Sequence, residues 1–373
     1  MHFKRFSTHL SEQRSSNYEI ELIENSYGFE QVPNCIYDKV HTYRDSILFS
    51  LMIKIPVVRK FLVRYLVCKK VKILLKQGTF SLVNIHCLQP YTDEIVRIAH
   101  KNNVKVLLTP YGSDFLRAKK KNKERLLNAL KEADNISCKK NSSFSRRLQV
   151  EYGIAKDRFV VLPYGSDVIS LIVKNRNNVS REVMSDALHI PYSNYNICCG
   201  YNAQKSQQHT QIIRALASIK KDLPKNYQII FPLTYGDAKF ELKKSLRQIS
   251  NNYGLKIVFL DDFLCDEHVS YLRLITDLFI HVQTTDATNS SIQEYLLGGA
   301  QCINGSWLSY PALEEKGLPY YQCKKIEDLS TVIKRVITNK EKPISLHPEI
   351  IKLIEGSSWN NVIKYWDMFY KSL

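Results

Sequence analysis

Short apolar runs typical of strands alternate with helical segments along most of the chain, and this alternation constrains the fold more than any other feature. Strands are predicted in one series at 81–86, 104–109, 135–138 and 159–163, and in a second series at 195–199, 227–233, 255–260, 278–282 and 300–303. Repeated strand–helix alternation is typical of a parallel, doubly wound sheet. The length of 373 residues suits about two domains of roughly 150 residues each. We therefore predict an α/β protein with two Rossmann-like domains.

The same pattern predicts where the domains divide. Residues 1–170 form the first domain and residues 195–345 the second, while polar clusters with weak periodicity at 171–194 predict a linker. Residues 346–373 close the chain with helices. The last helix is expected to carry an aromatic apolar face, formed by Trp359, Val362, Ile363, Trp366, Phe369 and Tyr370.

The chain is strongly basic. It carries 53 lysines and arginines against 36 acidic residues, a formal net charge of +17. Such an excess favours polyanionic partners, which include nucleic acid, an anionic membrane and phosphorylated small molecules, and it is also compatible with solubility alone. No helix-turn-helix, zinc-finger or RNP pattern occurs, so we predict no nucleic-acid partner.

The nine cysteines include no C-x-x-C pair, which argues against a zinc site or a disulfide framework and predicts free thiols in a reducing compartment. No apolar signal region follows the basic N-terminus. The most apolar stretch, 46–58, is shorter than the roughly 20 residues that a membrane-spanning helix needs. We expect a cytoplasmic protein that is soluble or peripheral to a membrane.

Two basic segments lie in the first domain, at 54–76 and 117–125. The first holds eight lysines and arginines, no acidic residue, and many apolar side chains between the cations. An apolar helix studded with cations is what binding to an anionic membrane surface requires. The alternative is a core helix whose basic face is solvated.

Open α/β sheets bind ligands beyond the carboxyl ends of their strands. In the loop after the fourth strand of the second series, Asp286 and Glu294 bracket a small polar turn that opens a helix. Asn289, Ser290 and Ser291 would place backbone amides and hydroxyls at the helix start, whose partial positive charge suits a phosphate. The alternative is a plain N-cap by Asn289 or Ser290.

Three further loops carry candidate residues. Gly200 ends a predicted strand and lets the backbone approach a ligand, and Lys205 could neutralise a diphosphate, whereas His209 is interpreted as a solvated helix-start residue. His86, at the end of a strand, is either catalytic or a structural histidine. Tyr111, Gly112 and Asp114 are candidates for substrate contact; the alternative is a turn in which Asp114 caps the next helix.

These motifs resemble glycosyltransferase family 4, which has the GT-B fold. The acidic pair Asp286 and Glu294, separated by seven residues, with the continuation 295–300, is similar to the family's acidic motif, although Asp286 stands where Glu is usual. Residues 109–114 resemble a T-P-x-G-S-D loop in which Tyr111 replaces a common His. The Gly200 loop is similar to the family's diphosphate loop, with Gln204 in place of the expected Arg.

A second family is also similar. Residues 200–209, 231–237 and 304–308 resemble the family 56 transferases, which add an aminodeoxyfucose to lipid-linked intermediates, invert configuration and lack the second acidic residue. Glu294 therefore favours the retaining family 4.

The resemblance implies two Rossmann-like domains facing each other across a cleft, with the C-terminal helices crossing back to the N-terminal domain. It implies transfer of a sugar from a nucleotide-diphospho-sugar, bound by residues 195–345, to a saccharide acceptor on the side of residues 1–170. Asp286 would hold the donor sugar and Glu294 the nucleotide ribose, with His86 facing the acceptor. No metal or cofactor is implied. The expected acceptor is lipid-linked, in bacterial surface polysaccharide synthesis at the cytoplasmic face of the membrane.

The resemblance leaves other classes open, namely an epimerase or phosphorylase on the same scaffold and a basic nucleic-acid-binding protein. A GT-B N-terminal domain usually begins with a strand, whereas residues 3–10 are typical of the helix that follows it. The first strand therefore either lies upstream of Met1 or is missing.

Overall fold

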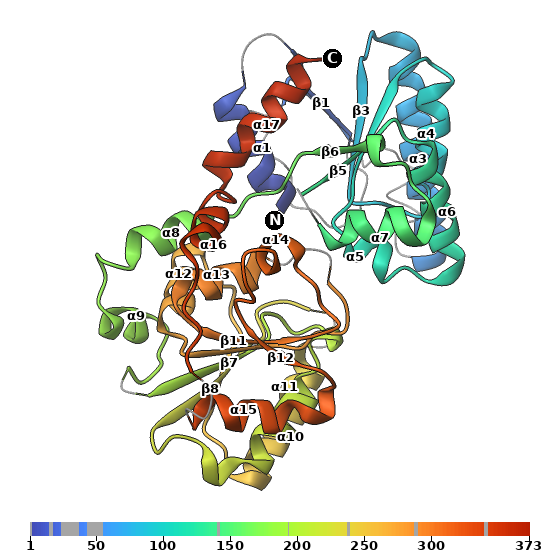
Figure 1. The fold of residues 1–373 in the computed structure, drawn as a ribbon. Helices are drawn as coiled ribbons and strands as arrows, with labels where there is room; N and C mark the ends of the chain where they lie inside the picture. Colours follow the sequence, from blue (N-terminus) through green and yellow to red (C-terminus); the bar gives the residue numbers. More distant parts are fainter. Residues whose placement is uncertain are drawn as a thin grey trace. The chain divides into compact units, whose positions relative to one another are not determined.

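The computed structural model describes residues 2–14, 18–23, 37–42, 55–139, 142–192, 194–236, 239–286, 290–338 and 342–373. The chain divides into two compact units (Figure 1). The N-terminal unit comprises Met1–Gly165 and Trp359–Leu373, and the C-terminal unit comprises Ser166–Ser358. Both are α/β units with parallel sheets, as the alternating pattern predicted.

The N-terminal unit is built on a parallel sheet whose strands pair in chain order. The strands are β3 (Leu82–His86), β4 (Lys105–Thr109), β5 (Asn135–Cys138) and β6 (Phe159–Val161). Its helices include α3 (Pro56–Gln77), α4 (Thr92–His100), α5 (Ser113–Leu116), α6 (Lys120–Glu132) and α7 (Ser143–Tyr152). A separate parallel pair is formed by β1 (Glu21–Ile23) and β2 (Lys39–His41).

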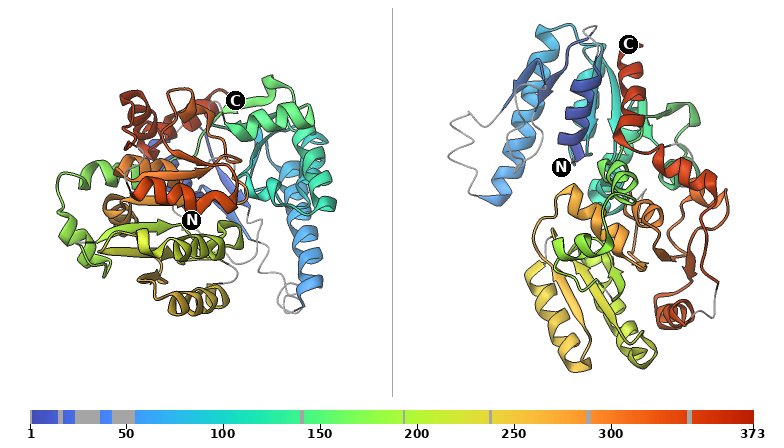
Figure 2. Two further views of the ribbon diagram at one scale, coloured as in Figure 1. Left: turned by 60° about the horizontal axis from the view of Figure 1, so that its bottom comes forward. Right: turned by 90° about the vertical axis from the view of Figure 1, so that its left-hand side faces the viewer.

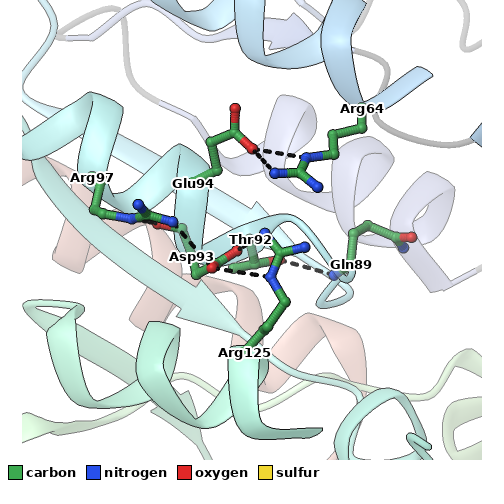
Figure 3. A network of polar contacts seen from close by, with 7 residues as sticks. All are labelled: Arg64, Gln89, Thr92, Asp93, Glu94, Arg97 and Arg125. Carbon is green, nitrogen blue, oxygen red and sulfur yellow. Dashed lines mark hydrogen bonds and ion pairs between the residues drawn. The ribbon is translucent and has the colours of Figure 1, made fainter. Parts of the chain in front are cut away.

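Two acidic residues of α4 connect the helices on one face of this unit (Figure 3). Asp93 accepts hydrogen bonds from Arg125 of α6 at 2.8 and 3.2 Å, and from Arg97 at 3.1 Å. Glu94 accepts from Arg64 of α3 at 2.8 Å. Arg64 and Arg125, which belong to the two basic segments, are therefore paired within the fold.

The first and last helices of the chain lie side by side in the N-terminal unit (Figures 1 and 2). They are α1 (His2–Gln13) and α17 (Trp359–Lys371). Phe6 of α1 packs with Leu107 of β4 and with Trp359 and Trp366 of α17 in one core. Trp366 also donates a hydrogen bond from Nε1 to the Pro163 carbonyl at 2.9 Å. The last fifteen residues are thus part of the core of a unit that begins at the other end of the chain.

The C-terminal unit has a six-stranded parallel sheet in the order β12-β11-β10-β7-β8-β9. The strands are β7 (Tyr195–Cys199), β8 (Tyr227–Pro232), β9 (Ile257–Leu260), β10 (Leu278–His281), β11 (Gln301–Gly305) and β12 (Tyr321–Cys323). The helices are α8 (Asp167–Asn175), α9 (Arg181–Ala187), α10 (His209–Ser218), α11 (Lys239–Tyr253), α12 (Asp266–Ile275), α13 (Ser290–Gly298), α14 (Pro311–Glu314), α15 (Leu329–Ile337) and α16 (Pro348–Glu355).

The central strands are apolar on both faces because helices cover both sides of the sheet (Figure 2). Successive residues of β10 pack on opposite faces of the sheet. Phe279 packs with α8, α12 and α13, whereas Leu278 and Ile280 pack with α10, α11 and α15. This three-layer arrangement explains why the strands were predicted from continuous apolar runs.

The segment 171–194, expected to be a linker, differs in the structure. It contains the end of α8 and all of α9, and both helices contact α12. Asn175 donates to Glu267 and Ser270 of α12, each at 2.9 Å. The apolar residues of α8 lie on a single buried stripe, and its polar neighbours concealed this stripe in the sequence pattern.

Replacing Trp366 with Ala should destabilise the protein by about 3–5 kcal/mol, because it empties a fully buried site in the core of the N-terminal unit. The neighbouring Tyr365 is 46% exposed, and Tyr365→Ala should change stability by about 0.5 kcal/mol or less. Urea denaturation of both variants measures the difference. Equal losses would show that α17 is not part of the core.

Candidate functional site

The strand order of the C-terminal unit places β7 and β10 side by side at its centre. From β7 the chain continues to β8 and β9 on one side of the sheet, and it then returns to β10, β11 and β12 on the other. In open α/β sheets, ligands bind at the carboxyl ends of the strands where the direction of winding reverses. The residues that follow β7 and β10 therefore form the candidate site.

Gly200 ends β7 in a conformation that favours glycine, with φ of 66°. Its N–H donates to the Ile280 carbonyl of β10 at 3.2 Å. A Cβ at this position would lie 2.9 Å from Gln207 Oε1 and 3.0 Å from His209 Nε2, so the loop closes tightly over the glycine. The positive φ and the lack of room for a Cβ both explain why glycine occupies position 200, as the sequence predicted.

A buried polar network joins the ends of the two central strands. Gln283, which is fully buried just after β10, accepts hydrogen bonds from Tyr201 at 3.1 Å and from Gln207 at 3.0 Å. On the next strand, Asn304 contacts His281 at 3.1 Å through its Oδ1 and the imidazole Nδ1. These side chains bring the loops after β7, β10 and β11 into one polar cluster.

Sequence reasoning missed His281, Gln283 and Asn304. Burial lowers the pKa of His281 to about 3, so its imidazole is neutral. A signal was present, since His281 and Gln283 are polar residues at alternate positions at the end of an otherwise apolar strand. Polar groups placed in a core are retained only where hydrogen bonds satisfy them.

Asp286 follows this network and is half-buried. Its Oδ2 accepts a hydrogen bond from the Tyr310 hydroxyl at 2.5 Å. Burial, and then the neighbouring Asp286 carboxylate, raises the pKa of Tyr310 well above its usual range, so the phenol stays a donor. Trp307 fixes the loop that carries Tyr310 by donating to the Gln283 carbonyl at 2.7 Å. Asp286 is thus an oriented carboxylate beside the polar cluster.

Glu294 lies deeper, on α13, with both carboxylate oxygens engaged. Oε1 accepts from Ser166 Oγ at 2.8 Å and Oε2 accepts from Arg273 Nε at 3.1 Å. The Arg273 guanidinium also lies 4.0 Å from the centre of the Tyr295 ring. Glu294 and Arg273 are each 5% exposed, so the pair is a buried ion pair within the C-terminal unit. The ribose-binding role remains a prediction.

The predicted phosphate-binding residues lie around the start of α13. Ser290 and Ser291 are its first two residues, whereas Asn289 lies outside the described residues. Lys205 is exposed, in the short turn that precedes α10. The carbonyl of its neighbour Ser206 accepts from the Thr284 N–H at 2.9 Å, so the Lys205 turn contacts the segment that leads to α13.

In the N-terminal unit, Asp114 joins two loops. Its carboxylate accepts hydrogen bonds from the backbone N–H groups of Leu88 at 2.7 Å, Phe115 at 3.0 Å and Tyr111 at 3.1 Å. Burial raises the pKa of Asp114 against the lowering effect of these donors. Gly112 has a φ of 83°, which the turn between them requires. Through these hydrogen bonds, the Asp114 carboxylate holds together the loops that follow β3 and β4.

His86 is embedded in aromatic side chains. One ring nitrogen contacts Asn84 Nδ2 at 3.0 Å and the other contacts the Tyr164 hydroxyl. The ring stacks on Trp366, with centroids 5.9 Å apart. Burial lowers its pKa to about 3, so the imidazole is neutral. Tyr164 continues the chain of contacts by donating to the Tyr111 hydroxyl at 3.4 Å. His86 thus has a partner at each ring nitrogen, and its role toward the acceptor stays a prediction.

A cavity of about 720 Å³ lies elsewhere in the C-terminal unit. Its lining includes Arg176, Arg181 and Gly299, and it reaches the start of β11 at Gln301. It therefore opens at the amino edge of the sheet, away from the polar cluster. The described residues contain no group of three or more His, Cys, Asp or Glu side chains arranged to hold a metal ion.

No protein-family model matches the chain. The bifunctional protein HldE of Aliarcobacter butzleri is 24% identical over 326 residues, covering 73% of this chain and 64% of that protein. The chain thus spans less than two thirds of the length of this curated relative.

Solved structures match over nearly the whole chain. HepE of Anabaena, in complex with UDP and glucose, has a TM-score of 0.68 at 15% identity and covers 100% of this chain and 96% of that chain. Sucrose-phosphate synthase of Thermosynechococcus elongatus has a TM-score of 0.70 at 10% identity, with 99% and 91% covered. This chain has the GT-B fold. The lipopolysaccharide outer core galactosyltransferase WaaB is also similar, with a TM-score of 0.58 at 15% identity and 89% and 84% covered.

Glu294→Ala should destabilise the GT-B chain by about 3–5 kcal/mol, because Arg273 would remain buried without its partner. The double variant Glu294→Ala/Arg273→Met should be less destabilised than Glu294→Ala alone, since it removes both charges. Urea denaturation measures Glu294→Ala, Arg273→Met and the double variant, with the exposed Glu182→Ala as control. A double variant as unstable as the sum of the single variants would contradict the pairing.

Proposed function

We propose that this GT-B protein is a glycosyltransferase that uses a nucleotide-diphospho-sugar donor. The observation that carries the proposal is the polar cluster at the carboxyl ends of β7 and β10, adjacent to Asp286 and to the segment that leads to α13. The structure of HepE, which shares the fold, holds UDP and glucose, and this supports a donor of the same chemical class.

The proposed roles follow from charge and position. The start of α13, with Ser290, Ser291 and Asn289, would bind the diphosphate together with Lys205. Preorganised donors of this kind stabilise the negative charge that grows on the leaving diphosphate. Asp286, oriented by Tyr310, would face the donor sugar. Since these groups supply the positive field, we propose that the reaction needs no metal ion or cofactor.

Glu294 is our candidate for the nucleotide ribose and for a retaining reaction. To bind ribose, it would exchange the Ser166 hydroxyl for a ribose hydroxyl and keep its contact with Arg273. This exchange replaces one neutral donor with another and leaves the buried ion pair intact.

Asp286→Asn should leave nucleoside diphosphate binding nearly unchanged, because the amide oxygen can still accept from Tyr310. Turnover should fall by about 100-fold or more, since the charge facing the donor sugar is lost. Thermal shift with UDP, GDP and TDP identifies the nucleotide, and release of that nucleotide from its sugar donor measures turnover in the presence of EDTA. Asp186→Asn, at an exposed position of α9, is the matched control. Absence of a shift with any of the three nucleotides would overturn the assignment.

The acceptor, on this proposal, is a lipid-linked saccharide of bacterial surface polysaccharide synthesis, bound through the N-terminal unit near Tyr111, Gly112 and Asp114. WaaB, a lipopolysaccharide galactosyltransferase of the same fold, supports this class of acceptor. Among the described residues, the helices are too short or too polar to cross a bilayer. We therefore propose a protein that works at the cytoplasmic face of the membrane as a peripheral enzyme.

The outer face of α3 supports membrane binding. Phe61 and Tyr65 are 67% and 58% exposed, and Lys69 lies on the same face one turn further, 5.8 Å from the centre of the Tyr65 ring. Exposed lysines at 72 and 76 continue this face. Aromatic side chains flanked by cations suit the headgroup region of an anionic bilayer. The second segment, 117–125, contributes exposed cations at Arg117 and at 119–121.

The protein should co-sediment with vesicles that contain phosphatidylglycerol but not with pure phosphatidylcholine, and binding should weaken as salt is added. The double variant Phe61→Ser/Tyr65→Ser should bind at least about tenfold more weakly, because each aromatic ring loses its apolar contact with the bilayer. Val150→Ser, at an 80% exposed position of α7, should bind like the wild type. Equal binding to both kinds of vesicle, or preference for duplex DNA, would contradict the proposal.

A further inference from the structure

The loop between β7 and α10 contains buried polar atoms without hydrogen-bond partners. Within the described part of the chain, both ring nitrogens of His209 and the Ser206 hydroxyl are in this state. His209 is 2% exposed, and its ring lies 5.5 Å from the Phe231 ring. The sequence pattern suggested a solvated His209, and the structure corrects this, because the side chain is buried.

An unsatisfied buried polar group is uncommon and calls for a physical explanation. The rest of the polar cluster is satisfied, since Gln207 and Gln283 bond to each other within the same loop contact. Burial lowers the pKa of His209 to about 4, so the imidazole is neutral and carries a single N–H donor. Within the described residues of this loop, the unused hydrogen-bonding capacity lies in the side chains of Ser206 and His209.

The position of His209 indicates what this capacity serves. His209 is the first residue of α10, and no side chain caps this helix, because the Gln208 amide donates instead to the Val282 carbonyl. A Cβ on Gly200 would lie 3.0 Å from His209 Nε2, so the imidazole faces the glycine turn at the end of β7. The start of α10 and the imidazole of His209 thus both lie at the end of β7, where we propose that the donor binds. The start of a helix attracts anions.

We propose that His209, with Ser206, is a donor-contact residue that hydrogen-bonds the anionic diphosphate of the nucleotide-sugar. This inference rests on the proposed function and deepens it. Lys205 of the same turn is exposed, whereas His209 is buried beside the end of β7, so its neutral imidazole would supply an N–H donor at that end of the strand. On binding, the turn at 205–208 moves aside so that the imidazole N–H and the Ser206 hydroxyl reach phosphate oxygens.

The test uses His209→Leu, which keeps the approximate volume and removes both nitrogens. Because these nitrogens have no hydrogen-bond partner among the described residues, the variant should be as stable as the wild type or more stable in urea. Its affinity for the nucleoside diphosphate and for inorganic pyrophosphate should fall by roughly 10- to 100-fold, the value of one hydrogen bond to a charged group. His209→Asn, which keeps an N–H donor, should recover part of the affinity.

His189→Asn is the control, since His189 is exposed and has a φ of 54° that asparagine tolerates. Isothermal titration calorimetry of the full chain measures both ligands. The inference is overturned if His209→Leu binds both ligands with unchanged affinity. It is also overturned if the affinity falls for the nucleotide but not for pyrophosphate. Neither result contradicts the proposed function. A stability loss with unchanged affinity, in His209→Leu or His209→Asn, shows a structural histidine and also overturns the inference. If the wild type binds no nucleoside diphosphate, the proposed function fails with it.

Discussion

The pairing of β7 with β10 is the contact on which the C-terminal unit depends. It joins two strands separated by two intervening strand–helix units, and it makes their carboxyl ends adjacent. The Gly200 N–H completes this pairing by bonding to the Ile280 carbonyl, and Gln283 continues it with side-chain contacts. The polar cluster thus exists because of the strand order, and a different order would leave the same residues apart.

Two kinds of buried polar group occur near this pairing, and they differ in how they are satisfied. Glu294 and Arg273 form a closed set, in which each carboxylate oxygen has a donor. In the part of the chain that the structure describes, neither ring nitrogen of His209 has a hydrogen-bond partner. Removing one partner of a buried ion pair is strongly destabilising, so such a pair holds its helices in place. A buried donor without a partner costs free energy in the folded protein, and a ligand that accepts its hydrogen bond recovers that cost. A ligand bound as proposed would satisfy polar atoms of the β7–α10 loop, whereas both carboxylate oxygens of Glu294 on α13 already accept hydrogen bonds within the protein.

The sequence predicted the strands β3 to β11, both α/β units and the glycine that follows β7, because apolar runs and glycine report local structure directly. It did not predict the helices within 171–194, whose apolar stripe is short and interrupted by polar residues. It also missed Gln283 and Asn304, and it interpreted His209 as solvated. The reason is physical: whether a polar side chain is buried, and whether it finds a partner, depends on residues that are remote in sequence and adjacent only after the sheet forms.

The basic residues include two groups: arginines that pair with carboxylates of the fold, and lysines that are exposed beside aromatic rings. Arg64, Arg97 and Arg125 are held by the acidic pair of α4, and Arg273 is buried against Glu294, so these cations stabilise the fold. The lysines on the outer face of α3 accompany exposed aromatic rings instead. Exposed rings and exposed lysines thus share one face of this helix. An anionic bilayer, the partner proposed above, would match both the charge and the apolar area of that face.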